Sequence, residues 1–83
     1  MKEVSTIGLD LAKKVFQVHG VDELGRTVIR RQLRRSEVLD FFEKLPPCLV
    51  GMEACATSHY WAREITALGH EVRMMPALSL IHI

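Results

Sequence analysis

Apolar and polar residues alternate with a period of two along the first part of the chain, a pattern typical of β-strands with one buried face. The pattern predicts strands over residues 4–10, 14–21 and 26–33. Between the second and third of these, residues 22–25 have the composition of a turn, and Gly25 can adopt a positive φ there. These three segments are therefore expected to form an antiparallel meander.

The later part of the chain changes to helical spacing and back to short apolar runs. Ser36 is expected to cap the first helix, and Pro46 and Pro47 are expected to end it. Gly69 is placed to end the second helix, which begins at Thr57 or Ser58. In chain order, the pattern predicts a helix over 36–45, a strand over 48–53, a helix over 57–69 and a strand over 70–75.

The predicted order of elements is β-β-β-α-β-α-β, which combines an antiparallel meander with two helical crossovers. Crossovers of this kind are right-handed and usually join neighbouring parallel strands. The expected fold class is therefore α/β, with one mixed sheet in the strand order 3-2-1-4-5. In that order the first and fourth strands lie side by side and run parallel, so their carboxyl ends coincide.

Each of these two parallel strands ends on a carboxylate, Asp10 in the first and Glu53 in the fourth. Ligands of α/β folds bind beyond the carboxyl ends of the strands. Mg²⁺ takes oxygen ligands and commonly uses one or two protein carboxylates. The two acids therefore predict half of a metal site. The alternatives are structural: a capping or turn carboxylate at Asp10, and a water-facing acid at Glu53.

Residues 7–13, Ile-Gly-Leu-Asp-Leu-Ala-Lys, and 51–63, Gly-Met-Glu-Ala-Cys-Ala-Thr-Ser-His-Tyr-Trp-Ala-Arg, carry a family resemblance. Together with residues 67–72, they resemble the amino-terminal domain of DEDD transposases, the Piv-type recombinases of bacterial insertion sequence family one-hundred-ten. The resemblance covers about residues 4–76. It implies a RuvC-like, ribonuclease H-type fold whose four acids support metal-dependent phosphoryl transfer at DNA.

By position, Asp10 matches the first acid of that family and Glu53 the second. The third and fourth acids, expected from a later Asp-x-x-Asp stretch, are lacking, as is a carboxy-terminal domain with a catalytic serine. The resemblance implies Mg²⁺, DNA and a guiding RNA for the complete protein. We expect this chain to be an incomplete fold, inactive alone. Residues 1–76 are interpreted as part of the catalytic domain, and 77–83 as a truncated or non-native tail.

Arginine is concentrated between residues 26 and 35, where five arginines occur in ten residues without an acid. One interpretation is a solvated edge strand whose charges block edge pairing. The other is contact with nucleic-acid phosphates, which makes binding salt-dependent. His59 is a further candidate because it lies near Glu53. The candidate nucleic-acid contacts are Lys13, Lys14, Arg30, Arg31, Arg34, Arg35 and His59.

The remaining composition narrows the possibilities little. A net charge of +1 creates no strong overall field, and neither a signal peptide nor a membrane-spanning run is visible, so we expect a cytoplasmic protein without a membrane partner. Cys48 and Cys55 are interpreted as two buried thiols. His19 and His70 are expected at strand surfaces or edges. Trp61 is expected in the core.

Two other functions compete with the transposase hypothesis. Sugar kinases and actin-like ATPases also open with a strand, Ile-Gly-x-Asp and a hairpin, but Leu11 follows Asp10 here in place of their phosphate-binding glycine and hydroxyl residues. A non-enzymatic remnant that binds RNA or another subunit is the second alternative. With 83 residues the core is small, and apolar surface left uncovered is expected to favour a homo-oligomer.

Overall fold

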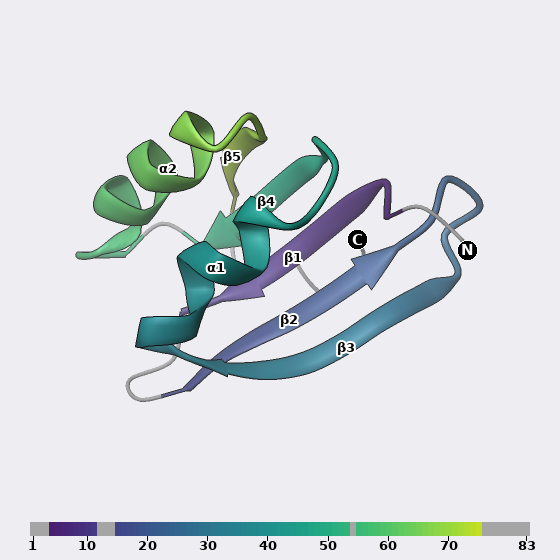
Figure 1. Cartoon of the computed structure of the whole chain (residues 1–83), viewed down its shortest axis with the longest axis horizontal. Helices are drawn as coiled ribbons and strands as arrows, with labels where there is room; N and C mark the ends of the chain where they lie inside the picture. The colour runs from purple at the N-terminus through teal and green to yellow at the C-terminus, as the bar shows by residue number, and fades with distance from the viewer. Residues whose placement is uncertain (1–3, 12–14, 54, 76–83) are drawn as a thin grey trace.

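The computed structural model describes residues 4–11, 15–53 and 55–75, which form one five-stranded mixed sheet with two α-helices (Figure 1). The strand order is β3-β2-β1-β4-β5, with antiparallel β1–β2 and β2–β3 pairs and parallel β1–β4 and β4–β5 pairs. The expected α/β class and strand order are confirmed. The elements are β1 (Thr6–Asp10), β2 (Val15–Val21), β3 (Thr27–Arg34), the 3₁₀ turn η1 (Arg35–Glu37), α1 (Val38–Glu43), β4 (Leu49–Glu53), α2 (Ser58–Ala67) and β5 (Glu71–Met75).

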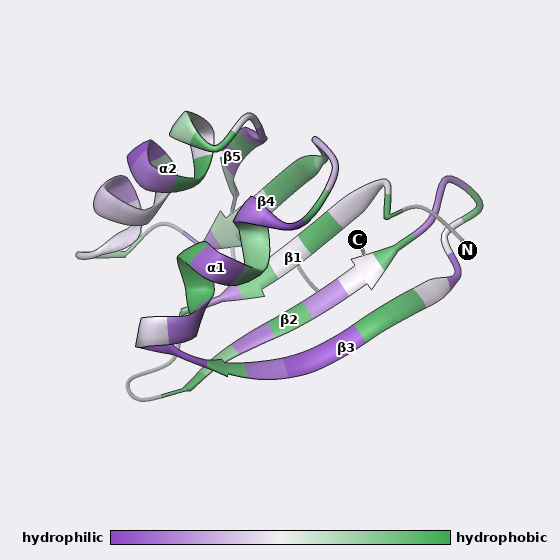
Figure 2. Cartoon of the chain, in the orientation of Figure 1, coloured by the Kyte–Doolittle hydropathy of each residue, from purple (hydrophilic) through white to green (hydrophobic). Residues whose placement is uncertain are grey.

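The core lies between the sheet and both helices, which pack on the same face of the sheet. Alternate residues of the central strands, including Leu9 and Met52, are fully buried there because successive strand side chains point to opposite faces. Trp61 of α2 belongs to this core, as predicted, and its ring meets Phe16 edge to face at 5.3 Å. Figure 2 shows β1 and β4 as largely hydrophobic, whereas the middle of the edge strand β3 is hydrophilic.

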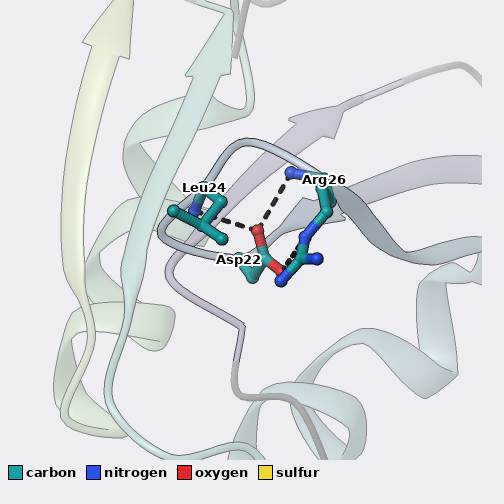
Figure 3. Close-up of polar contacts among 3 residues, drawn as sticks. All are labelled: Asp22, Leu24 and Arg26. Carbon is teal, nitrogen blue, oxygen red and sulfur yellow. Dashed lines mark hydrogen bonds and ion pairs between the residues drawn. The ribbon is translucent and has the colours of Figure 1, made fainter.

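The β2–β3 turn has the predicted form. Gly25 adopts a φ of 80°, which a residue with a side chain rarely adopts. Asp22 organises the turn: its Oδ1 accepts hydrogen bonds from the N–H groups of Leu24 at 3.0 Å and Arg26 at 2.9 Å (Figure 3). Its Oδ2 accepts a further bond from Arg26 Nε at 3.1 Å. These contacts hold the hairpin closed at the end where β1 begins.

The first helix differs from the prediction at both ends. Ser36 does not cap it, because residues 35–37 form the 3₁₀ turn η1 and the regular helix starts at Val38. The Glu37 carboxylate instead accepts a hydrogen bond from the Arg34 N–H at 2.7 Å. The helix ends at Glu43, two residues before the expected end, where the chain tightens into a turn.

The second helix ends as predicted. Gly69 follows its last turn with a φ of 101°, and its N–H donates to the carbonyl of Thr66 at 2.9 Å. A glycine at this position avoids the steric cost that a Cβ atom would add. Among the residues that the structure describes, no helix has the length and apolar character needed to cross a membrane. The predicted tail at 77–83 lies outside the described residues.

Candidate functional site

Asp10 and Glu53 lie at the carboxyl ends of two neighbouring parallel strands. The β1–β4 pairing continues in register to Leu9 opposite Met52, and each carboxylate is the next residue of its strand. Since paired strands are about 4.8 Å apart, the backbones of the two acids lie close together. Asp10 is exposed and Glu53 is partly buried. The structure therefore brings the two predicted acids to one edge of the sheet.

The two carboxylates belong to the sheet face that the helices leave uncovered. Leu9 and Met52 are buried against the helices, so alternation places Asp10 and Glu53 on the opposite face. Among the described residues, neither side chain makes a hydrogen bond or ion pair. The same residues contain no cluster of three or more His, Cys, Asp or Glu side chains suited to a metal. The two acids therefore provide two carboxylate ligands, which are fewer than a metal ion needs.

The predicted arginine cluster is divided between the two faces of the sheet. Arg30 and Arg34 of β3 pair with β2 residues on the uncovered face. Arg31 points to the helix side, where its guanidinium lies 5.4 Å from the centre of the Phe41 ring. Arg35 lies beyond the strand in η1. The four arginines are exposed, with Arg30 and Arg34 on the sheet face opposite to that of Arg31.

The other predicted nucleic-acid contacts are less informative. His59 is exposed in the first turn of α2, at the end of the sheet where Asp10 and Glu53 lie. Lys13 and Lys14 fall outside the described residues. His19 lies on the surface of β2, as expected, and its Nε2 is 3.2 Å from the hydroxyl of Thr27. The nucleic-acid contacts proposed for His59, Lys13 and Lys14 stay predictions.

His70 corrects one prediction made from the sequence. Instead of lying at a strand surface, its side chain is only 3% exposed. Nδ1 accepts a hydrogen bond from the Cys48 N–H at 3.2 Å, and Nε2 donates to the Phe42 carbonyl at 2.7 Å. The two bonds therefore require the proton on Nε2. His70 joins the end of α1 to the starts of β4 and β5, and its position in a connection explains why periodicity did not reveal it.

The two cysteines differ, which corrects the expectation that both are buried. Cys48 is buried just before β4, and burial raises the pKa of its thiol to about 11. Cys55 is exposed, with its sulfur 3.8 Å from the Thr57 hydroxyl. It follows the end of β4, where the chain has left the core. Both thiols are free in the structure.

Most of the chain is similar to one region of several proteins named as transposases. It is 65% identical over 72 residues to a probable family 20 transposase from Pseudomonas aeruginosa, and 40% identical over 75 residues to a transposase for insertion sequence element IS1328 from Yersinia enterocolitica. It is 35% identical over 69 residues to a transposase for insertion sequence element IS1111A from Coxiella burnetii. These matches cover 87%, 90% and 83% of the chain. Its homologues are thus transposases, two of them named for insertion sequences.

The chain spans about a fifth of the length of these relatives, from 19% to 22%. No protein-family model matches it. The comparisons therefore show that the chain is similar to part of several transposases. They leave the residues that carry out its chemistry to be argued from the structure.

Proposed function

We propose that this chain is part of the catalytic domain of a DEDD transposase with a ribonuclease H-like, RuvC-like fold. In the complete protein, Asp10 and Glu53 bind Mg²⁺ for phosphoryl transfer during DNA transposition of an insertion sequence. The observation that supports this most directly is the parallel register of β1 and β4, which makes the two acids adjacent. The transposase homologues agree with a reaction at DNA.

The chemistry of the two side chains fits a divalent cation. Two neighbouring carboxylates repel each other and repel DNA phosphates, and a cation between them offsets both effects. Carboxylate oxygens are ligands that Mg²⁺ prefers. When bound, the ion supplies charge stabilisation for in-line displacement at phosphorus. The part played by Asp10 and Glu53 is to fix its position at the end of a rigid sheet.

Two carboxylates are half of the four that the DEDD family uses. We propose that the remaining two come from a later segment of the complete protein, and that the present chain is inactive alone. A guiding RNA and a homo-oligomeric assembly are further parts of the proposal. Both acids belong to the uncovered face of the sheet, so the remaining carboxylates of the metal site would approach from this face.

The test uses the complete transposase that contains this chain, with Asp10→Asn and Glu53→Gln as nearly isosteric neutral variants. Mg²⁺ is expected to raise the Tm of the wild-type protein, because a ligand that binds the folded state stabilises it. This shift should disappear in the double variant, and DNA strand transfer should fall at least about a thousandfold, since metal catalysis contributes several kcal/mol.

Glu43→Gln is the matched control because Glu43 is an exposed carboxylate at the end of α1. It should retain both the Mg²⁺ shift and strand transfer. A Mg²⁺ shift that is unchanged in the double variant would contradict the metal site. Nucleic-acid binding that survives without any metal dependence would favour the second candidate, a binding module that uses the exposed residues Arg30 and Arg34 of the edge strand β3.

A further inference from the structure

A cavity of about 480 Å³ opens between η1 and the first turn of α2. Arg35 on one side directly follows β3, and Thr57 on the other lies four residues after Glu53. The cavity is thus at the same end of the sheet as the two carboxylates, where the β1 and β4 arrows end and both helices begin (Figure 1). Its lining consists of Arg35, Ser36, Leu39, Thr57, Tyr60 and Trp61.

An exposed aromatic ring at this cavity is held by buried ones. Tyr60 is 47% exposed, although it packs edge to face against Trp61 with ring centres 5.0 Å apart. Trp61 is 5% exposed and makes a second edge-to-face contact with Phe16 at 5.3 Å. The guanidinium of Arg35 lies 6.0 Å from the centre of the same Phe16 ring. Tyr60 and Arg35 are therefore positioned by one aromatic cluster in the core.

The charge of this cavity differs from that of two others on the molecule. One is lined by Asp22 and Arg26, which form an ion pair at 3.1 Å. Another combines Arg31 with Glu37 and other charges of both signs. The cavity beside Tyr60 has Arg35 and no acid among its described lining residues, and the described residues provide no ion-pair partner for this arginine. Its chemistry suits an anion joined to an aromatic group.

We propose that this cavity binds one nucleotide of a single nucleic-acid strand, with the base stacked on Tyr60 and a phosphate on Arg35. Aromatic side chains stack on bases of any sequence, and a guanidinium recognises phosphate through paired N–H groups. The Ser36 and Thr57 hydroxyls add hydrogen-bonding groups. Double-stranded DNA does not fit this mode because its bases are stacked within the duplex.

The inference rests on the proposed function, since it defines how one strand approaches the acids. Arg35 follows the strand two positions away from β1 in the sheet, about 10 Å at the usual strand spacing. The cavity lies on the helix side, whereas alternation assigns Asp10 to the opposite face. A nucleic-acid strand bound at Tyr60 therefore has to pass around the end of the β-sheet to reach the carboxylates of Asp10 and Glu53.

The experiment uses the complete transposase with Tyr60→Ala, Tyr60→Phe and Arg35→Gln. The probes are a single-stranded DNA oligonucleotide containing aminopurine, the RNA of the same sequence, and the DNA duplex. Tyr60→Ala should weaken single-strand binding roughly 5- to 150-fold and relieve the quenching of aminopurine by stacking. Tyr60→Phe should retain both. Arg35→Gln should weaken binding and lower the salt slope by roughly one phosphate contact.

Arg73→Gln is the control because Arg73 is exposed on β5 and pairs with Glu71 at 2.8 Å; it should bind normally. Binding and quenching by Tyr60→Ala at wild-type levels, or preference for the duplex, would overturn the inference. If Tyr60→Ala melts at a lower temperature, Tyr60→Phe and Arg35→Gln still decide between stacking and structural roles. Preference for DNA or RNA identifies the strand. Suppose that Asp10→Asn loses Mg²⁺-dependent strand transfer while Tyr60→Ala binds single strands normally. This result refutes the nucleotide-binding cavity and leaves the proposed metal site intact.

Discussion

Two pairs of polar side chains, one at each end of the sheet, differ in their hydrogen-bond partners. At the end where β1, β4 and β5 begin, Asp22 and His70 are buried, and each hydrogen-bonds to at least two partners within the protein. At the end where β1 and β4 finish, Asp10 and Glu53 have no such partner among the described residues. The contacts of Asp22 and His70 therefore stabilise the fold, whereas the carboxylates of Asp10 and Glu53 make no such contribution within the described part of the chain.

This difference follows from the cost of burying polar groups. An unsatisfied buried donor or acceptor costs about 1–3 kcal/mol. A buried polar residue such as His70 is therefore found together with its hydrogen-bond partners. An exposed carboxylate such as Asp10 is hydrated and needs no protein partner. The partners of a polar residue therefore help to show which polar residues stabilise this fold. The comparison can be tested at both ends.

The cysteines report the largest expected difference, because one lies at each end. In the complete protein at about pH 8, a thiol-reactive label should modify exposed Cys55 readily. Cys48 reacts only when the structure opens, which slows it roughly a thousandfold if opening costs about 4 kcal/mol. Peptide-resolved mass spectrometry measures both rates, and denaturant should equalise them. Equal rates in the folded protein would remove the distinction between the ends.

His70→Ala tests the stabilising end directly. It leaves the Cys48 N–H and the Phe42 carbonyl without their hydrogen-bond partner in the core. The expected loss is about 2–4 kcal/mol in the free energy of unfolding of the complete protein, measured by urea denaturation. The matched control is His59→Ala, which removes an exposed histidine at the other end and should change stability by less than about 0.5 kcal/mol. Similar losses for the two variants would contradict the comparison.

The sequence predicted the fold where local patterns are strong. The strand order followed from the alternation in the meander and from the two crossovers, and the glycines at 25 and 69 marked real turns. The helix start was missed because Glu37, one residue after Ser36, bonds the Arg34 N–H and stabilises a 3₁₀ turn instead. Such short-range competition is not visible in hydrophobic spacing.

The candidate site was predicted only where its residues lie in segments with a strong local pattern. Asp10 and Glu53 end apolar strands, so the strand order alone brought them together. His70 and Cys55 were misplaced because both lie in connections, where no periodicity indicates burial. Tyr60 was missed since its neighbour Trp61 carries the apolar stripe of α2, and only packing shows that Tyr60 stays exposed beside Arg35.

The smallest expected effect comes from Asp22→Asn and appears as a change in pH dependence. The Arg26 N–H, aided by the Leu24 N–H and the Arg26 guanidinium and opposed by burial, holds the pKa of Asp22 below its ordinary value of 3.8. Because the folded-state pKa is lowered, the ionised carboxylate stabilises the fold above pH 3.8. This stabilisation is lost as pH falls through the lower folded-state value.

Wild type should therefore be more stable than Asp22→Asn at neutral pH, and the difference should shrink as the carboxylate is protonated. Urea denaturation of the complete protein from neutral pH to below 3.8 measures this change. Glu23→Gln alters the neighbouring exposed carboxylate and should leave the acid dependence close to that of wild type. A constant difference between wild type and Asp22→Asn at every pH would mean that the turn is held by geometry alone, without help from the charge of Asp22.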